Sequence, residues 1–184
     1  MRKIRELVSI MSILCLACGV SYAASSYPGK GSVLSSLGRK YDYNNIAVKR
    51  AVDGDTLLLE NGERVRLIGI DTPECHESKK LYRDAKRTMQ DVQTIKHMGK
   101  SAAAFTRRLV EGKKVRLEFD VERRDKYNRL LAYIYLPDGT FVNAEIVANG
   151  YASLMTIAPN VKHAELLRAR YKEAREKRRG LWKD

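Results

Sequence analysis

Cysteine is scarce in this chain, and two of its three cysteines lie close to the start. Cys15 and Cys18 belong to an apolar N-terminal segment, so only Cys75 is left in the remaining sequence. A single thiol excludes an intrachain disulfide, and the fold must therefore rest on its core. Cys75 directly follows Glu74. We interpret it as a small residue in a loop, and a redox-sensitive thiol beside an active site is the alternative.

Histidine is equally scarce. His76, His97 and His163 are far apart in the sequence, and no Cys/His group has the spacing of a zinc motif. The sequence therefore gives no sign of a zinc site.

Long apolar runs are absent beyond the N-terminus. Residues 1–5 are basic, Leu7–Val20 is apolar, and Ser21–Ala23 supplies the small residues that a signal peptidase reads. This pattern predicts a signal peptide, 1–23, cleaved after about Ala23, and a secreted or periplasmic protein without a transmembrane anchor. A membrane anchor is the alternative, although the run is short for a bilayer. A lipid-modified Cys18 is a further alternative.

Acidic residues are the minority among the charges. The chain has 35 basic and 22 acidic residues, and removal of 1–23 takes away three basic residues and one acidic one. A surplus of this size favours a polyanionic partner such as nucleic acid or an anionic surface. Charge alone does not separate these partners from a basic protein without a specific one. The remaining length suits one domain with its own core.

The hydrophobic pattern predicts a β-rich fold. The expected strands, bounded by turns such as Asp53-Gly54 and Asn61-Gly62, are 46–52, 56–60, 64–70, 113–120 and 130–136. The expected helices are 99–109, 142–148 and 161–179, and the charged segment 78–91 is compatible with a further one. Together they predict an α+β fold, a five-stranded OB-fold barrel with about three helices. It would occupy residues 46–184, after a flexible arm at 24–45.

Carboxylates cluster at the ends of the expected strands. Asp55 and Asp71 are candidate metal ligands, and an all-oxygen site favours Ca²⁺ or Mg²⁺. Asp55 could equally belong to an ordinary Asp-Gly-Asp turn. Glu74 follows Pro73 and suits a general base that activates water. The alternative is that residues 71–74 start a helix.

Two arginines accompany these carboxylates. Arg66 lies in the middle of an expected strand, on the face opposite Val65 and Leu67. Arg129 follows the turn at 125–128. The planar guanidinium suits two phosphate oxygens, although either residue could be an ordinary surface arginine. Hard-metal ligands together with phosphate-binding arginines indicate a nuclease.

Three segments carry a resemblance to a known family. Residues 48–56, 66–74 and 125–133 resemble the motifs of the thermonuclease, or staphylococcal nuclease-like, family, in the same order. The resemblance runs from about Ile46 to Trp182. It implies an OB-fold barrel with three helices and a Ca²⁺-dependent phosphodiesterase that acts on DNA and RNA with low sequence specificity. No stable protein partner is implied, and we expect a monomer.

The resemblance also implies a role for individual residues. Asp55 and Asp71 would bind calcium through their side chains, and Thr72 through its backbone carbonyl. Glu74 would be the general base. Arg66 and Arg129 would hold the scissile phosphate. Lys126 and Tyr127 match positions near the nucleotide's phosphate. The implied products carry a 3′-phosphate.

The chain departs from the family pattern in three places. Asn128 stands where the family usually has glycine, and asparagine tolerates positive φ. The loop after Glu74, at 75–98, is longer by about a dozen residues in a rough alignment, which could extend or cover the substrate groove. Residues 152–159 lack the tyrosines that some members use to stack on the base. Tyr82 or Tyr151 could supply that stacking.

Three functions remain to be separated. The first is a secreted Ca²⁺-dependent nuclease, which uses all of the motifs. The second is a binding module of the same fold that no longer cuts, but such a module has no need of the five matched chemical positions. The third is a basic envelope protein with an anionic partner, which leaves the motifs unexplained. The first function is the one that the sequence favours.

Overall fold

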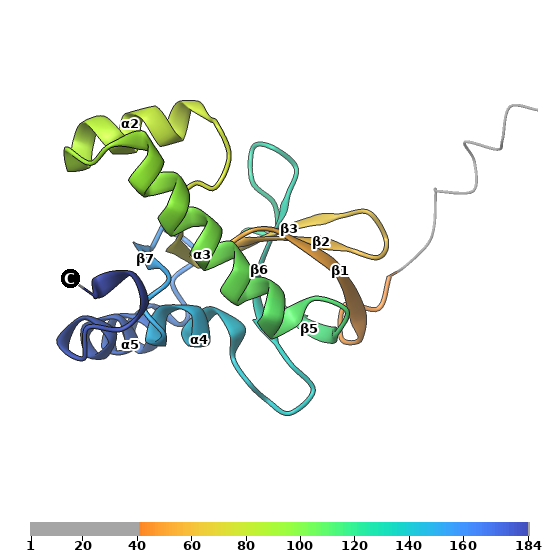
Figure 1. Cartoon of the computed structure of the whole chain (residues 1–184). Coiled ribbons are helices and arrows are strands. Elements are labelled where there is room, and N and C mark those ends of the chain that lie inside the picture. Colours follow the sequence, from red (N-terminus) through yellow and green to blue (C-terminus); the bar gives the residue numbers. More distant parts are fainter. Residues whose placement is uncertain (1–40, 184) are drawn as a thin grey trace, which may run out of the picture. The chain divides into compact units, whose positions relative to one another are not determined.

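The computed structural model describes residues 41–183, and five of its strands form a closed barrel with the helices gathered largely on one side of it (Figure 1). The predicted signal peptide, 1–23, and most of the predicted arm lie outside the described residues. The barrel strands, in the order in which they neighbour one another, are β1 (Ile46–Asp53), β2 (Thr56–Leu59), β3 (Arg64–Leu67), β6 (Leu130–Tyr135) and β5 (Lys114–Glu118). All neighbours are antiparallel except β3 and β6. The predicted α+β barrel is confirmed.

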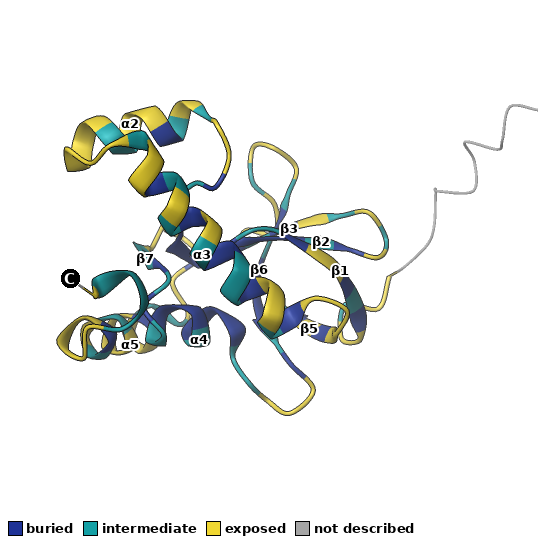
Figure 2. Cartoon of the chain, viewed as in Figure 1, coloured by how far each residue is buried: buried dark blue, intermediate teal, exposed yellow. Residues whose placement is uncertain are grey.

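Alternating side chains explain why these segments are strands. Val65 and Leu67 of β3 are fully buried, and Val115 and Leu117 of β5 point into the same core. Arg66 lies between the first two and points to the opposite face, as the alternation predicts. Figure 2 shows the barrel strands mainly as buried, whereas the outer turns are exposed.

The segment predicted as one strand at 64–70 is two strands, so this prediction was wrong. β3 ends at Leu67, and β4 (Gly69–Asp71) begins after a break and pairs with β7 (Ser153–Met155) outside the barrel. Gly69 adopts φ +82°, a conformation that other residues rarely reach. A side chain there would also lie 2.5 Å from Leu167 Cδ1. The break turns the chain away from the barrel and carries Asp71 to the site described below.

Four α-helices flank the barrel in the described residues, one more than the three firmly expected. They are α2 (Lys79–Thr88), α3 (Val92–Val110), α4 (Val142–Ala148) and α5 (Ala164–Glu176), followed by a short 3₁₀ helix, η2 (Gly180–Trp182). α3 packs against β1, and α4 packs against α5 (Figure 1). No helix among residues 41–183 is both long and apolar enough to span a membrane.

α3 is longer than predicted because it starts at a polar cap. The Asp91 side chain accepts a hydrogen bond from the Thr94 N–H at 2.9 Å, which fixes the N-terminus of the helix. Ile95 belongs to its buried face and lies before the predicted start at residue 99.

Tyr43 lies near the start of the described residues, in the segment predicted to be a flexible arm. It packs edge-on against Phe119 with ring centroids 5.4 Å apart.

Candidate active site

Six charged residues cluster in one cavity of about 330 Å³ at the edge of the barrel, which Asp53, Arg64 and Arg83 also line. Five of them were predicted as site residues and one was not; the six are Asp55, Arg66, Asp71, Glu74, Lys80 and Arg129. Asp55 comes from the turn between β1 and β2, and Asp71 from the end of β4. The fold therefore brings together the catalytic and metal-ligating side chains that the sequence predicts.

Asp55 is fixed by several hydrogen bonds. Its Oδ2 accepts from the Thr72 N–H at 2.8 Å and from the Thr72 hydroxyl at 3.0 Å. Its Oδ1 accepts from the Thr56 hydroxyl at 3.1 Å. Only 6% of Asp55 is exposed. These bonds tie the β1–β2 turn to the end of β4, so an Asp-Gly-Asp turn alone does not account for Asp55.

Arg66 bridges the two aspartates. Its Nη1 lies 2.8 Å from Asp55 Oδ2, and its Nη2 lies 2.9 Å from Asp71 Oδ1. Only 13% of the arginine side chain is exposed. Arg66 is therefore a countercharge shared by two largely buried carboxylates, and not an ordinary surface arginine.

Lys80 of α2 reaches the same cluster, and the sequence did not predict it. Its Nζ lies 3.2 Å from Asp71 Oδ1, 3.0 Å from Glu74 Oε1 and 3.0 Å from the Thr72 carbonyl oxygen. Three oxygens thus converge on one positively charged atom. The only available signal was a lysine on a possible helix after Glu74, and the sequence did not show that it folds back.

The charges of this cluster shift the pKa values of its members. Burial raises the pKa of Asp71 above its usual range, although Lys80 and Arg66 oppose the effect. Burial alone would lower the pKa of Lys80, but the charges of Asp71 and Glu74 outweigh it and raise the pKa. The lysine is therefore held in its charged form by the carboxylates around it.

Glu74 is held between α2 and α3. Ser78 donates a hydrogen bond to Glu74 Oε2 at 3.3 Å and also caps α2 by accepting from the Leu81 N–H. A Cβ on Gly99 of α3 would lie 2.4 Å from the Glu74 carbonyl, so glycine is required for this close approach. The helix begins after Ser78, and the alternative that residues 71–74 form its cap is wrong.

The second arginine sits on a turn. Asp125 Oδ2 lies 2.7 Å from both Nε and Nη2 of Arg129, and its Oδ1 accepts from the Tyr127 and Arg129 N–H groups at 2.9 Å. Burial opposes these bonds, but they hold the pKa of Asp125 below its usual range. Asn128 adopts φ +62°, so the expectation that it tolerates positive φ is confirmed.

A second cavity of about 380 Å³ adjoins the first and shares Arg66, Arg129 and Met155 with it. Its further lining includes Lys126 and Tyr127, the predicted substrate-binding residues, together with Ile157. Met155 and Ile157 thus supply apolar side chains in the segment that lacks tyrosines.

The two other aromatic candidates lie elsewhere. Tyr151 stacks on Phe105 against the core, with ring centroids 4.6 Å apart, and lines neither cavity. Tyr82 lies on α2 with 55% of its surface exposed, and it also lines neither cavity. Of the tyrosines considered, only Tyr127 borders the space beside the two arginines.

The segment at 75–98, which is longer than in the family pattern, is largely helical, in agreement with the possible helix at 78–91. It forms α2 and the first part of α3. Leu81 is fully buried and anchors α2, while most of the helix is exposed (Figure 2). The Lys80 contacts make this segment a direct neighbour of the carboxylates.

Oxygen atoms make up the donor set in this cavity. The Asp55 and Asp71 carboxylates and the Thr72 carbonyl are hard ligands of the kind that Ca²⁺ and Mg²⁺ prefer. Two of these oxygens, Asp71 Oδ1 and Thr72 O, already contact the positively charged Nζ of Lys80. The residues present therefore fit a hard divalent ion.

The fold and the cavity define a barrel protein with carboxylates and arginines gathered in one cavity. A model of the family described as staphylococcal nuclease homologue matches residues 64–184. The chain is 35% identical to the thermonuclease of Staphylococcus intermedius, over 99% of both chains, and 29% identical to that of Staphylococcus hyicus over the same shares. It is also 29% identical to the endonuclease YncB of Bacillus subtilis (strain 168), over 94% of this chain and 87% of the other.

The chain therefore belongs to the staphylococcal nuclease family. It is a hydrolase of the nuclease class. The resemblance predicted from three short motifs is confirmed.

Proposed function

We propose that this protein is a secreted, Ca²⁺-dependent nuclease that hydrolyses phosphodiester bonds of DNA and RNA with low sequence specificity. One observation carries the proposal. Oxygens of Asp71, Thr72 and Glu74 converge on the Lys80 ammonium nitrogen, beside Arg66. Phosphodiester hydrolysis needs positive charge, a base and phosphate-binding groups within one cavity.

The calcium ion would be held by the side chains of Asp55 and Asp71 and by the backbone carbonyl of Thr72. When bound, it supplies positive charge that offsets the charge of the phosphate. Asp55 is held by Thr72 and Arg66, which favours a ligand set arranged before the ion arrives.

Glu74 acts as the general base in this proposal. A carboxylate oxygen of Glu74 takes the proton of the attacking water while the new O–P bond forms. The bond from phosphorus to the 5′-oxygen breaks, and that oxygen takes a proton from solvent, which leaves a 3′-phosphate and a 5′-hydroxyl. Lys80 at Oε1 and Ser78 at Oε2 orient the carboxylate.

Arg66 and Arg129 bind the phosphate from two sides. Each guanidinium is already fixed by a carboxylate, Arg66 by Asp71 and Arg129 by Asp125, so little side-chain entropy is lost on binding. Negative charge grows on the phosphate oxygens as water attacks, and both arginines stabilise it. Both line the cavity that also holds Glu74.

Lys126 and Tyr127 bind the nucleotide next to the scissile phosphate. Both border the second cavity, where Met155 and Ile157 offer an apolar surface to a base. These contacts do not read the edges of the bases, which supports low sequence specificity. Contacts with several phosphates predict that binding weakens steeply with salt.

Export rests on residues 1–23, whose pattern is that of a signal peptide. We propose cleavage after about Ala23, a mature monomer whose nuclease domain spans 46–184 after an arm at 24–45, and a secreted or periplasmic location.

Cleavage of single-stranded DNA and of RNA by the purified chain tests the proposal. We expect cutting with millimolar-range Ca²⁺ and none with a chelator, with Mg²⁺ run in parallel to separate the two hard ions. The binding-module alternative predicts tight, salt-sensitive binding of the same oligonucleotides without cutting in any metal, and that result would overturn the proposal.

A further inference from the structure

We propose that Asp53, Cys75 and His76 form a second metal site, for a zinc-class ion such as Zn²⁺ or Co²⁺, and that its occupancy slows cleavage. Their ligand atoms, one from each residue, lie within 4.8 Å of one another. The sequence gave no zinc spacing because the three ligands come from two separate segments. Asp53 ends β1, and Cys75 and His76 follow β4.

The three groups lie close together. Cys75 Sγ is 2.9 Å from Nδ1 of His76, and an oxygen of the Asp53 carboxylate lies within 4.8 Å of the other two ligand atoms. A tetrahedral zinc ion, with bonds of about 2.3 Å to sulfur and 2.0 Å to nitrogen, holds these two atoms about 3.5 Å apart. His76 is exposed, so a small rotation of its ring is enough to admit an ion.

The donor set selects the ion. Thiolate and imidazole are ligands for zinc and cobalt, whereas calcium prefers oxygen. Ca²⁺ at the Asp55 and Asp71 cluster and a zinc-class ion at Cys75 would therefore not compete for the same atoms. On binding, the thiol releases its proton to the buffer as the bond from sulfur to metal forms, and no electron is transferred.

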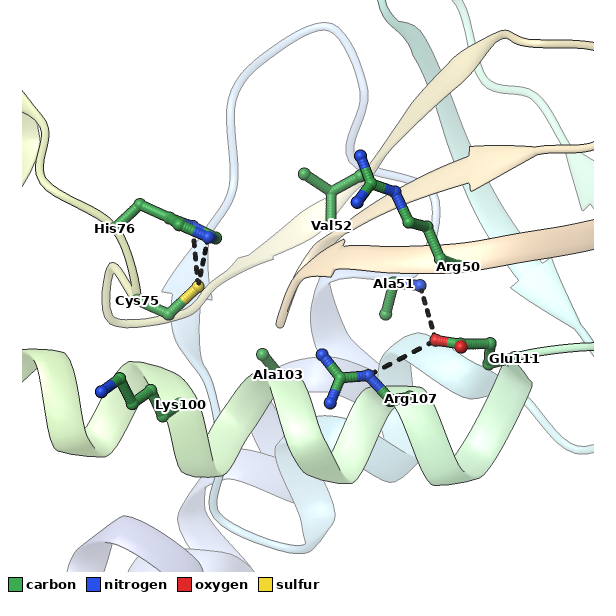
Figure 3. Close-up of a pocket in the computed structure, with 9 residues that line it drawn as sticks. All are labelled: Arg50, Ala51, Val52, Cys75, His76, Lys100, Ala103, Arg107 and Glu111. Carbon is green, nitrogen blue, oxygen red and sulfur yellow. Dashed lines mark hydrogen bonds and ion pairs between the residues drawn. The ribbon is translucent and has the colours of Figure 1, made fainter.

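The site has an entrance. Cys75 and His76 lie at one end of a cavity of about 750 Å³, which runs between β1 and α3 toward Glu111 (Figure 3). Three protein ligands leave a fourth position for water, which is typical of an exchangeable ion and not of a structural one. The ion would therefore come and go with its concentration in the surroundings.

Occupancy is coupled to the nuclease site through the chain itself. Cys75 is the direct neighbour of Glu74, and Asp53 lies two residues before Asp55. Drawing Asp53 and Cys75 onto one ion moves the backbone that carries the proposed base and a proposed calcium ligand. Small displacements of such groups slow catalysis markedly. This part of the inference rests on the proposed function, whereas metal binding does not.

Cobalt spectroscopy tests the site without any activity. The full chain carrying Cys15→Ser and Cys18→Ser, so that Cys75 is the only thiol, is titrated with Co²⁺ in saturating Ca²⁺. We expect a thiolate-to-cobalt charge-transfer band that saturates at one ion per chain and disappears when Zn²⁺ is added. Cys75→Ser should abolish the band.

His76→Ala is a second test, and it should leave the fold intact because His76 is exposed. It should weaken Co²⁺ binding by roughly tenfold or more, and His97→Ala, an exposed histidine of α3, should leave binding unchanged. Absence of the band, or a band with the same affinity in His76→Ala, would overturn the site.

Cleavage of single-stranded DNA in saturating Ca²⁺ then tests the coupling. Zn²⁺ should slow the parent chain several-fold and leave Cys75→Ser close to its own zinc-free rate. Equal inhibition of both would place the zinc effect at the carboxylate cluster and overturn the coupling. If Ca²⁺ alone supports no cleavage, the proposed function fails, while the cobalt band still decides the metal site.

Discussion

Arg66 and Arg129 line the same cavity, but the molecule holds them in different ways. Arg66 is 13% exposed and pairs with Asp55 and Asp71, which come from different elements. Arg129 is 28% exposed and pairs with Asp125 inside a single turn. One arginine therefore connects parts of the fold, while the other only completes a local turn. Two arginines with the same proposed role can therefore differ in how far their position depends on contacts between distant segments.

Among the substitutions that test the contrast between the two arginines, replacement of Arg129 should produce the largest effect, and it should be on the cleavage rate. In Arg129→Ala, the cleavage rate should fall by roughly 10²–10³-fold because a preorganised donor to the phosphate is lost. The free energy of unfolding should change by less than about 1 kcal/mol because the pair with Asp125 is partly exposed. Single-turnover cleavage and urea unfolding measure the two quantities.

Arg129→Lys serves as the control for charge, since it keeps the charge but not the planar fork. It should recover only part of the rate. A loss of stability in Arg129→Ala as large as the loss in Arg66→Ala would break the contrast between the two arginines.

Replacement of Arg66 should cost stability as well as rate. Arg66→Ala leaves two largely buried carboxylates without the countercharge that they share, so the free energy of unfolding in chelator should fall by about 2–4 kcal/mol. Ca²⁺ should restore part of that loss because it brings positive charge to the same carboxylates. Arg64→Ala, an exposed arginine on the same strand, should change stability little. Urea unfolding that is equally easy for both variants would contradict the role of Arg66 in the fold.

Replacement of Lys80 should strengthen calcium binding. Its ammonium lies within 3.2 Å of Asp71 Oδ1 and of the Thr72 carbonyl, so it repels an incoming cation and occupies part of its space. Lys80→Met should lower the calorimetric Kd for Ca²⁺ about tenfold, a free-energy change of about 1.4 kcal/mol. The exposed neighbour in Lys79→Met is the matched control. An unchanged Kd in Lys80→Met would show that the lysine does not oppose the ion.

An effect of similar size concerns pH. Burial, followed by the charge of Asp55, raises the pKa of Asp53 to about 6 from 3.8. The folded state thus binds this proton more tightly than the unfolded chain, and stability contributed by Asp53 is lost as pH rises from about 4 to 6. In chelator at pH 8, Asp53→Asn should be more stable than the parent by about 1–2 kcal/mol. That gain should vanish near pH 4, and a gain independent of pH would contradict the raised pKa.

Local patterns were sufficient to predict much of this molecule. The alternation around Val65 and Leu67 predicts a barrel strand and places Arg66 on the other face, and the Asn61-Gly62 turn predicts the hairpin. The bounds of α4, at 142–148, agree with the prediction. These features depend on neighbours in sequence, and so a single chain reveals them.

Contacts between distant segments were not predictable in the same way. The break at Gly69 depends on Leu167, which packs against it from α5, and β7 exists only because β4 leaves the barrel to meet it. Lys80 reaches the carboxylates because the buried Leu81 anchors α2, which packs against α3. Such contacts are set by tertiary packing, which propensity and periodicity do not contain.

The most direct test of the account compares Glu74→Gln with the parent chain. Single-turnover cleavage of single-stranded DNA is measured in saturating Ca²⁺, with the calorimetric Kd for Ca²⁺ as the control for an intact site. The account predicts a rate lower by about 10²–10⁴-fold with a nearly unchanged Kd, because Glu74 accepts a proton and is not a required metal ligand. A variant that cuts as fast as the parent would contradict Glu74 as the base and, with it, the proposed mechanism.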